Sequence, residues 1–514
     1  MKNKKILTLN FKYAGFIIFS IGVISSFGFA PFHFFPLTIF SYVFLIYFLK
    51  KIKREKKNIF LYSLLYSLGI HLGLLYWIAI SFQTANSGGY YAGSLAVFIL
   101  SVFLSIFLAL PFYFLFKYNR SFKNISFGFL FIFIFTTFDW LKGNILWGFP
   151  WTSISSLWSF SSITLFPFSV FGVWGYSLIT YSLIVSFYYF FFNLKKGIFF
   201  SLPFIFATFI LPNILKVSEN KIDTISVRIV QPNIKQEDKW DKKKFINNYK
   251  KLSSLITLPG YKEIDLIILP ETAIDFGIDE LNKNKNKNSF DLAQIKNIII
   301  GALRIKKNDN EVNIFNSMFL IQKNNTNILY HDKLKLVPFG EFIPFSKIFK
   351  LNKLTSGQID FSPGENPRVF ELSAKINILP LICYEVIFPK LTSELNNNYN
   401  LIVNITNDDW YKNSSGPYQH FSHSKIRAVM EGRTLIRSAN TGISGIINPK
   451  GIVISKLGIQ KEGVIDYRLN IKNIETVYSV YREKVFYLIM LTLFMLICIS
   501  FFYNKFKKDK SKSY

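Results

Sequence analysis

Cysteine is scarce in this sequence, with only Cys383 and Cys498 among 514 residues. Two cysteines exclude a small scaffold held together by several disulfides. Charge is also sparse, because Asp, Glu, Lys and Arg make up 18% of the chain and only 31 residues are acidic. A chain with so little charge and 50% hydrophobic residues is not disordered, and we do not expect it to be wholly soluble.

The shortage of acidic residues leaves a net charge of +29, which by itself is typical of a nucleic-acid-binding protein. The positions of the lysines argue against that function, because many of them stand in short clusters between long apolar runs. No nucleic-acid partner is therefore predicted.

Eight apolar stretches are long enough, or nearly so, to cross a hydrocarbon core about 30 Å thick. The chain therefore divides into a membrane domain with seven spans at 1–216, a globular domain at 217–483, and an eighth span with a basic tail at 484–514. The predicted spans are 12–30, 32–49, 58–82, 92–116, 124–141, 165–192, 197–215 and 485–503.

The orientation follows from Lys and Arg in the short loops. Basic residues fill the N-terminus, the loops after the second, fourth and sixth spans, and the C-terminal tail, whereas the alternate loops contain only Lys142. Both termini are therefore predicted to be cytoplasmic and residues 217–483 to lie on the far side. In a bacterium this means a multi-pass protein of the inner (cytoplasmic) membrane with a periplasmic globular domain.

The globular block alternates short β-rich runs with helical stretches at 243–256 and 418–433. Such alternation predicts an α/β sheet with helices packed on it. The segment LNKNKNKNS at 281–289 is predicted to be a solvated loop. The predicted strands are 225–231, 265–270, 297–303, 378–383, 401–406 and 441–449.

Three chemically distinct residues follow apolar runs in this block. Glu271 follows one in LPETAID, Cys383 ends one in PLICYE, and Lys333 lies just beyond one in YHDKLKLVPFGEFIP. Sites in α/β proteins form where strands end, so these groups can converge. The set suits nucleophilic catalysis, because an ammonium favours the thiolate and stabilises an oxyanion, while a carboxylate accepts the thiol proton.

Each of these residues also has a purely structural interpretation. A cysteine after an apolar run is commonly a small core residue, a Glu at a strand end is most often solvated, and Lys335 competes directly with Lys333. A free thiol in an oxidising compartment favours a functional cysteine. The residues alone leave these alternatives open.

Several motifs accompany these residues in a fixed order. They are FAPFHFFP (29–36), NILWGFPW (144–151), QPNIKQEDKWD (231–241), LPETAI (269–274), KLKLVPFGEFIP (333–344), ICYEVIF (382–388), NITNDDWY (404–411), GPYQHF (416–421) and EGRTLIRSANTG (431–442). With them the sequence closely resembles the apolipoprotein N-acyltransferases, membrane members of the nitrilase superfamily, over nearly the whole chain. The resemblance implies an α-β-β-α sandwich of the nitrilase type beside about eight transmembrane helices.

The resemblance also implies a Glu–Lys–Cys triad of Glu271, Lys333 and Cys383. Lys333 is preferred to Lys335 because the family's catalytic lysine stands eight residues before the glutamate of the VPFGE motif, which is Glu341 here. Glu341 is expected to support the triad. Further supporting residues implied by the family are Trp240 and Tyr384 around the site and its mobile loops, and Glu385 as a stabilising neighbour of the nucleophile.

One loop departs from the family pattern. The family often reads NDAWFG where this chain reads NDDWYK, so that Asp409 and Lys412 replace two small residues. The fine structure of this loop is therefore expected to differ from the family's, whereas the chemistry is not.

The activity implied by the resemblance is a two-step acyl transfer. Cys383 attacks an ester of a membrane phospholipid, which gives a thioester and a lysophospholipid. The free α-amino group of the diacylglyceryl-cysteine of an apolipoprotein then takes the acyl chain. The implied partners are the phospholipid, the diacylated apolipoprotein and the bilayer, and no cofactor or metal is implied.

Two other functions compete with this one. A membrane-anchored amidase or nitrilase would use the same triad with water as the second nucleophile, although a single anchor would then suffice. A transporter or receptor would be expected to carry intramembrane charges and paired halves, whereas the predicted spans hold few ionisable groups and no symmetric halves.

Several further residues carry structural expectations. His420 and His423 have a spacing that suits a metal, but no acidic or thiol ligand is placed with them, so no metal site is predicted. His331 is expected at the surface. Asp139, at the outer end of the fifth span, either lines a substrate cleft or is exposed at the interface. Three tryptophans of an outward loop are expected to form an interfacial belt or to contact acyl chains, namely Trp147, Trp151 and Trp158.

The charge pattern predicts the result of reporter fusions. A reporter fused after residue 217 should signal the far side of the membrane, and one fused after residue 505 should signal the cytoplasm, because basic loops remain on the cytoplasmic side. Paired alkaline phosphatase and fluorescent-protein fusions measure both locations. A cytoplasmic signal from the first fusion would overturn the assignment of compartments.

Overall fold

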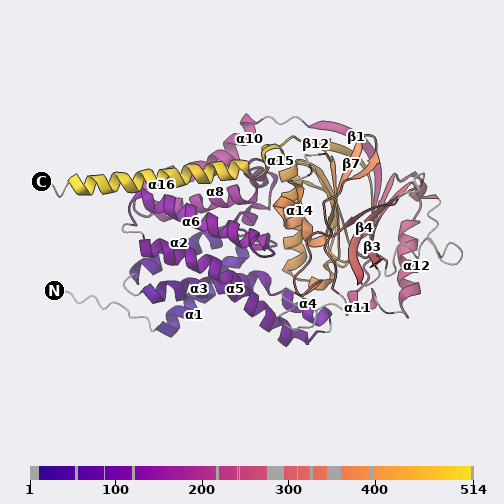
Figure 1. The fold of residues 1–514 in the computed structure, drawn as a ribbon, viewed down its shortest axis with the longest axis horizontal. Helices are drawn as coiled ribbons and strands as arrows, with labels where there is room; N and C mark the ends of the chain where they lie inside the picture. The colour runs from indigo at the N-terminus through magenta and orange to yellow at the C-terminus, as the bar shows by residue number, and fades with distance from the viewer. Residues whose placement is uncertain are drawn as a thin grey trace.

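The computed structural model describes residues 11–52, 56–85, 87–118, 122–215, 219–239, 241, 243–274, 294–308, 311–323, 328–343, 360–393, 395 and 398–510. A layer of helices forms one half of the molecule and an α/β domain forms the other (Figure 1). The last helix of the chain leaves the α/β domain and returns along the helical layer (Figure 1).

Six of the described helical segments are long and apolar enough to cross a membrane. The first two helices, α1 (Phe11–Ser25) and α2 (Phe35–Lys51), have only 15 and 17 residues. Of the eight predicted spans, six therefore correspond to described helical segments that are long and apolar enough to cross a membrane. The six are α3 (Lys56–Leu75), α5 (Gly89–Tyr118), α6 (Ile125–Asn144), α8 (Phe168–Phe190), the stretch Leu194–Ile214 made of α9 (Leu194–Ile205), η4 (Phe206–Ile210) and α10 (Leu211–Ile214), and α16 (Lys484–Lys510).

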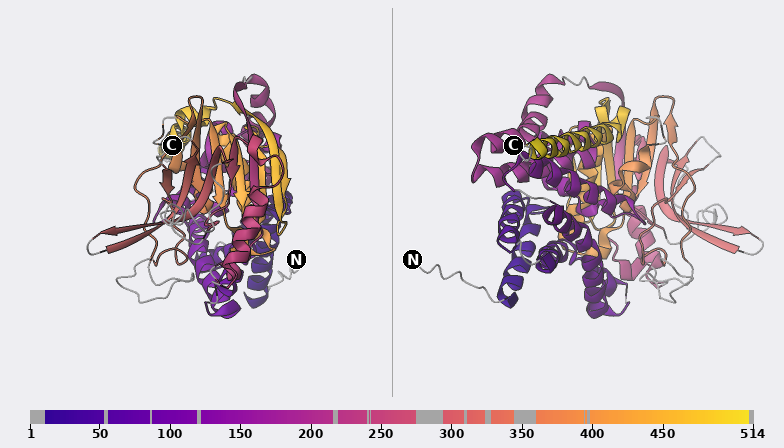
Figure 2. Two further views of the ribbon diagram at one scale, coloured as in Figure 1. Left: turned by 90° about the vertical axis from the view of Figure 1, so that its right-hand side faces the viewer. Right: turned by 60° about the vertical axis from the view of Figure 1, so that its left-hand side comes forward.

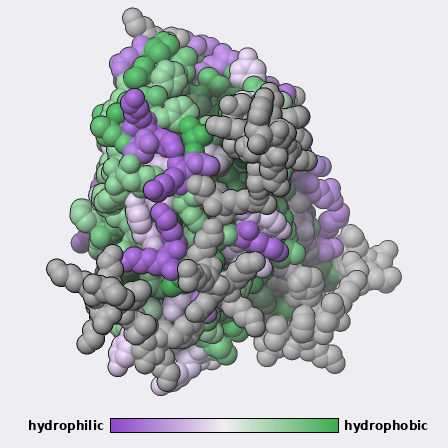
Figure 3. Space-filling view, turned by 90° about the vertical axis from the view of Figure 1, so that its left-hand side faces the viewer, coloured by the Kyte–Doolittle hydropathy of each residue, from purple (hydrophilic) through white to green (hydrophobic). Residues whose placement is uncertain are grey.

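The end of the helical layer that is remote from the α/β domain is basic. Lys50 Nζ lies 5.9 Å and 5.8 Å from the ring centroids of Phe122 and Phe192, and Lys196 donates a hydrogen bond to the backbone carbonyl of Lys123. Hydrophilic side chains gather on this end next to hydrophobic ones (Figure 3). Loops that are far apart in sequence therefore bring their positive charge to the same end of the layer.

The α/β domain contains two six-stranded sheets. The first has the order β12-β1-β2-β3-β4-β5, with β1, β2 and β3 parallel, and the second has the order β11-β10-β9-β8-β7-β6, with β7, β8 and β9 parallel. The strands of the first sheet are β1 (Asn220–Gln231), β2 (Leu266–Ile268), β3 (Asn297–Asn308), β4 (Glu311–Gln322), β5 (Leu329–Asp332) and β12 (Gly463–Asn473). Those of the second are β6 (Phe370–Ser373), β7 (Ile376–Ile382), β8 (Leu401–Thr406), β9 (Thr434–Ala439), β10 (Ser444–Ile447) and β11 (Val453–Leu457).

The two sheets face each other across an apolar core in which Ile268 and Ile378 are fully buried. Leu252 and its neighbours on α12 (Phe245–Ile256) cover the outer face of the first sheet. The helix α14 (Ser415–Glu431) covers the second sheet and lies between it and the helical layer (Figure 1). The layer order α-β-β-α confirms the fold class that the resemblance implied.

The predicted strands all overlap observed ones, and most of them are buried parallel strands, which read as continuous apolar runs. The strands that were not predicted include β12, whose residues alternate irregularly between buried and exposed. β3 and β4 pair along their full length, and their hairpin projects from the sandwich (Figure 2). Residues 281–289, predicted to form a loop, lie outside the described residues.

Gln419 of α14 joins the sandwich to the helical layer. Its Oε1 accepts hydrogen bonds from the indole nitrogens of Trp77 at 3.2 Å and Trp151 at 2.8 Å. Its Nε2 donates to the backbone carbonyls of Leu74 at 3.2 Å and Ala30 at 3.5 Å. The side chain is 6% exposed, so one buried amide satisfies polar groups from three segments of the helical layer.

Replacing the Gln419 amide should weaken the contact between the sandwich and the helical layer. Gln419→Leu keeps the volume but leaves two buried indole N–H groups without an acceptor, at a cost of about 1–3 kcal/mol each. We expect a lower thermal unfolding midpoint for the detergent-solubilised protein. Tyr418→Ala, at the adjacent and 40% exposed position, is the control and should unfold near the parent. Equal midpoints for Gln419→Leu and the parent would contradict this role.

Candidate active site

The candidate nucleophile, base and ammonium lie at the ends of three strands. Glu271 follows β2 after two residues, Lys333 directly follows β5, and Cys383 directly follows β7. β2 and β5 belong to the first sheet and β7 to the second. Because the two sheets face each other, residues that are more than a hundred positions apart in sequence reach one site between them.

Lys333 holds two carboxylates together. Its Nζ lies 2.9 Å from Glu341 Oε1 and 3.4 Å from Glu271 Oε1, and its side chain is 1% exposed. Burial opposes the charged form, but the carboxylates of Glu341 and Glu271 outweigh burial and raise the pKa of Lys333. Lys335, the alternative lysine, is exposed and lies over the Phe388 ring at 5.5 Å, so the ion cluster contains Lys333.

Two asparagines orient the Glu271 carboxylate. Asn316 Nδ2 donates to Glu271 Oε1 at 2.7 Å and to Glu341 Oε1 at 3.0 Å. The backbone N–H of Asn407 donates to Glu271 Oε2 at 2.8 Å. Neither asparagine was predicted, although Asn316 stands out as a polar residue in the apolar run IFNSMFL of β4.

Cys383 sits on a strained turn. Its φ is +50°, a conformation that non-glycine residues rarely adopt and that clusters at functional sites. Burial and the Glu271 carboxylate raise the pKa of the thiol, whereas Lys333 acts in the opposite direction. The resting thiol is therefore protonated at neutral pH, although the Lys333 ammonium favours the thiolate, as was expected of a nearby lysine.

Polar groups beneath the turn hold it in place. The Cys383 carbonyl accepts from His420 Nε2 at 3.1 Å and from Asn404 Nδ2 at 3.4 Å. His420 Nδ1 lies 2.9 Å from Asp408, which also pairs with Arg437 at 2.8 Å. His420 is thus occupied by the turn, and the described residues contain no group of three His, Cys, Asp or Glu side chains placed to hold a metal.

Glu385 links the lysine loop to the cysteine turn. It accepts the backbone N–H of Ile382 at 2.7 Å and that of Leu334 at 2.6 Å. Burial would raise its pKa, but the charge and hydrogen bond of His331 and the backbone donors lower it, so Glu385 is ionised. The expected surface position of His331 is wrong, because its side chain is buried and lies 3.3 Å from Glu385.

The aromatic residues near the cysteine face the helical layer. The Tyr384 ring lies 4.8 Å from that of Phe388 and 6.3 Å from that of Trp151, with the Trp151 pair stacked. Trp151 and Trp158 are only 3% and 2% exposed. An interfacial belt is therefore wrong for these two indoles, whose N–H groups bond inside the protein to Gln419 and Thr180. Trp240 lies outside the described residues.

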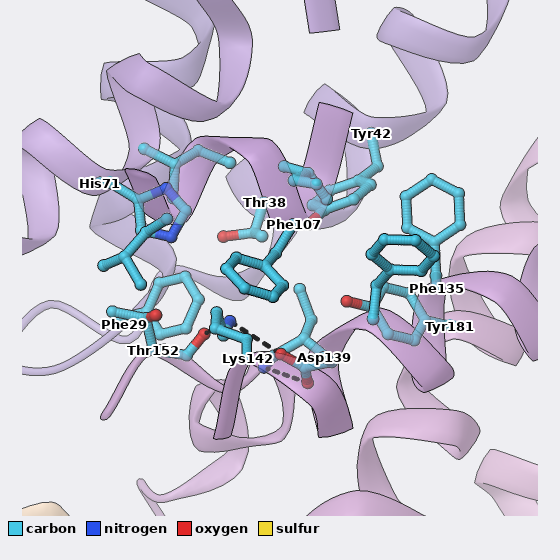
Figure 4. Close-up of a pocket in the computed structure, with 15 residues that line it drawn as sticks. Phe29, Thr38, Tyr42, His71, Phe107, Phe135, Asp139, Lys142, Thr152 and Tyr181 are labelled. Carbon is cyan, nitrogen blue, oxygen red and sulfur yellow. Dashed lines mark hydrogen bonds and ion pairs between the residues drawn. The ribbon is translucent and has the colours of Figure 1, made fainter. Parts of the chain in front are cut away.

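A pocket lies among the helices (Figure 4). Asp139 and Lys142 form an ion pair of 2.8 Å at its wall, so the carboxylate is buried in a pocket rather than exposed at the interface. A smaller pocket shares Phe29 and Thr152 with the first and extends to Trp151. The first pocket is lined mainly by aromatic and aliphatic side chains, among them Phe29, Tyr42, Phe107, Phe135, Phe138 and Tyr181.

Comparisons with known proteins agree over both halves of the chain. Residues 21–209 match the apolipoprotein N-acyltransferase N-terminal domain, and residues 226–478 match carbon-nitrogen hydrolase. The apolipoprotein N-acyltransferase of Rickettsia prowazekii is 33% identical over 462 residues, which cover 87% of this chain and 91% of the relative. The chain belongs to the apolipoprotein N-acyltransferase family.

Two further comparisons are with a second relative and with a solved structure. The apolipoprotein N-acyltransferase of Rickettsia typhi is 33% identical over 473 residues, which cover 88% of this chain and 92% of the relative. Among solved structures, Saccharomyces cerevisiae Nit3, a member of branch 10 of the nitrilase superfamily, covers 52% of this family member and 97% of its own chain, with 19% identity and a TM-score of 0.36.

The two lysines of the KLK segment should differ sharply in importance. Lys333→Ala should abolish activity, and Lys333→Arg should also fail, because a planar guanidinium does not fit the place of a compact ammonium between two carboxylates. Lys335→Ala should retain most activity because that side chain is exposed. Acyl transfer to a lipoprotein substrate by purified variants measures the difference. An inactive Lys335→Ala beside an active Lys333→Ala would show that the wrong lysine is assigned.

Proposed function

We propose that this enzyme moves a fatty acyl chain from a membrane phospholipid to the N-terminal α-amino group of diacylglyceryl-cysteine in apolipoproteins, the last step of lipoprotein maturation. Membership of the family supports an acyltransferase. The structural observation that carries the proposal is the position of the cysteine turn. Tyr384, the residue after Cys383, stacks on Trp151 at the helical layer, which suits a lipid substrate.

The first half-reaction joins the acyl chain to Cys383. Glu271 takes the thiol proton, and the sulfur attacks the carbonyl carbon of the phospholipid ester. The tetrahedral oxyanion is stabilised by the Lys333 ammonium. Collapse of this intermediate breaks the bond to the glycerol oxygen, which takes the proton from Glu271 and leaves as lysophospholipid. The raised pKa of the thiol makes the carboxylate base necessary.

The second half-reaction transfers the chain to an amine. The neutral α-amino group of the lipoprotein attacks the thioester carbonyl, and Glu271 accepts the proton that the nitrogen loses. The carbon–sulfur bond then breaks, the sulfur regains a proton from Glu271, and an amide is formed. Glu341 supports both steps because its carboxylate and that of Glu271 share the same ammonium.

The membrane helices keep the insoluble acyl chain of the substrate out of water. Moving roughly fifteen methylenes into water costs about 12 kcal/mol at ~0.8 kcal/mol each, so the acyl chain must stay in apolar surroundings. The apolar side chains that line the pocket among the helices, among them Phe107 and Phe135, offer such surroundings. The hydroxyl of Thr152, which lines both pockets, has no hydrogen-bond partner among the described residues, and it is available to an ester carbonyl.

The same arrangement supports the predicted orientation in the inner membrane. The basic end of the helical layer suits the cytoplasmic side, and the sandwich at the opposite end suits the periplasm. The end of α10 at Ile214 and the start of α16 at Lys484 support the proposed domain divisions at 216 and 484. A nitrilase-type domain fits hydrolysis too, but it does not favour an amidase over an acyltransferase.

The covalent mechanism predicts an acyl-enzyme formed from phospholipid alone. Cys383 should acquire a chain before any lipoprotein is added, and neutral hydroxylamine should release it. Cys383→Ala should abolish the adduct, whereas Cys498→Ala should behave like the parent. Intact-protein mass spectrometry detects the added mass. An adduct that persists in Cys383→Ala, or transfer that requires both substrates bound together, would refute the mechanism.

The base should show itself in the pH dependence. Glu271→Gln should slow the adduct's formation by about a hundredfold or more at neutral pH. Its rate should recover partly at alkaline pH, because removing the Glu271 charge lowers the pKa of the thiol and higher pH deprotonates it directly. Stopped time courses from pH 6 to 10 test this. A Glu271→Gln rate equal to that of the parent at pH 7 would exclude Glu271 as the base.

A further inference from the structure

Lys412 occupies a backbone position that favours glycine. Its φ is +47° and its ψ is −146°, a region in which a side chain is strained. Lysine has no local hydrogen bond of the Asn type to offset that strain. A lysine retained at such a position points to a role for its side chain.

The Lys412 side chain joins two segments of the sandwich. Its Nζ lies 3.1 Å from Asp409 Oδ2 on its own turn and 3.2 Å from Glu237 Oε1 on α11 (Gln236–Lys239). Asp409 Oδ2 also accepts the backbone N–H of Gln236 at 2.6 Å. Asp409 and Lys412 therefore both hold the start of α11. The Asp409 carboxylate binds the Gln236 N–H, and the Lys412 ammonium binds the Glu237 carboxylate.

The helix α11 contacts the candidate base by two routes. Gln236 Oε1 accepts from Asn407 Nδ2 at 2.6 Å, and the N–H of Asn407 donates to the Glu271 carboxylate. At the other end of α11, Lys239 Nζ donates to the Glu271 backbone carbonyl at 3.0 Å. A displacement of α11 thus disturbs both the carboxylate and the backbone of Glu271.

The turn that carries Asp409 is anchored on its other side to the helical layer. Ser81 Oγ of α4 (Ile78–Thr84) donates to the Trp410 carbonyl at 3.1 Å. The Tyr411 ring lies 4.4 Å from that of Trp77. The turn is consequently a fixed point against which α11 is held.

We propose that Asp409 and Lys412 are positioning residues that hold α11 against Glu271 and so keep its carboxylate aligned for proton transfer. The inference rests on the proposed role of Glu271 as the base. It assigns a function to Asp409 and Lys412, the two residues of the NDDWYK turn that replace small residues of the family pattern.

The test uses Lys412→Gly in the full-length enzyme. Glycine relieves the backbone strain but removes the ammonium. The rate of thioester formation should therefore fall without a loss of thermal stability. We expect the single-turnover rate of thioester formation at saturating phospholipid to fall by about threefold to tenfold, with the KM for phospholipid unchanged. The thermal unfolding midpoint should stay the same or rise. A merely structural role would instead make the rate follow the midpoint.

Companion variants sharpen the result. Lys412→Arg keeps the charge and should recover most of the rate, and Asp409→Ala should lose at least as much rate as Lys412→Gly. The control is Lys244→Ala, which removes another ion pair to α11, that of Lys244 with Asp238 at 2.6 Å, whose side chains are 50% and 29% exposed. This pair is largely solvated and therefore contributes little to holding α11, so the control should match the parent.

The outcomes are distinct. A parental rate for Lys412→Gly, or equal losses for Lys412→Gly and Lys244→Ala, would overturn the inference. A fall in rate that is matched by a fall in the unfolding midpoint would also overturn it. Failure of the proposed base is recognised separately, because Glu271→Gln would then form the thioester at the parental rate in the same assay.

Discussion

The buried ammonium of Lys333 is the constraint on which the rest of the site depends. A charge with 1% exposure is tolerated only when opposite charge meets it, and here Glu341 and Glu271 do so together. Two carboxylates around one ammonium leave excess negative charge, which the donors of Asn316 and of the Asn407 backbone offset. The Glu271 carboxylate is consequently held in one orientation by the same contacts that make its burial possible.

The same negative surroundings explain why Cys383, as the proposed nucleophile, needs a base. The Cys383 thiol is buried and near a carboxylate, and both conditions disfavour the thiolate. The strained turn is then maintained by groups that take no part in proton transfer, among them His420 and Asn404 beneath its carbonyl. Glu385 connects this turn to the lysine loop, so the two halves of the site are held in register.

The contact between the sandwich and the helical layer also depends on buried polar groups that satisfy one another. Gln419 satisfies two indoles and two carbonyls at a buried contact, and Trp151 contacts both Gln419 and the ring of Tyr384. Trp151 thus belongs both to the contact between the two halves of the molecule and to the aromatic surroundings of the cysteine turn. A soluble enzyme with the same sheets would have no need of this aromatic contact.

The sequence by itself indicated the membrane and globular parts and many of the strands, and it singled out Glu271, Lys333 and Cys383 as candidates, because long apolar runs and ordered motifs are local signals. It did not reveal Asn316, the burial of His331 or the pairing of Asp139 with Lys142. These depend on which faces of two separate sheets, or of several helices, come together. Tertiary structure alone decided them, since burial and charge pairing are properties of neighbours in space and leave no periodic trace along the chain.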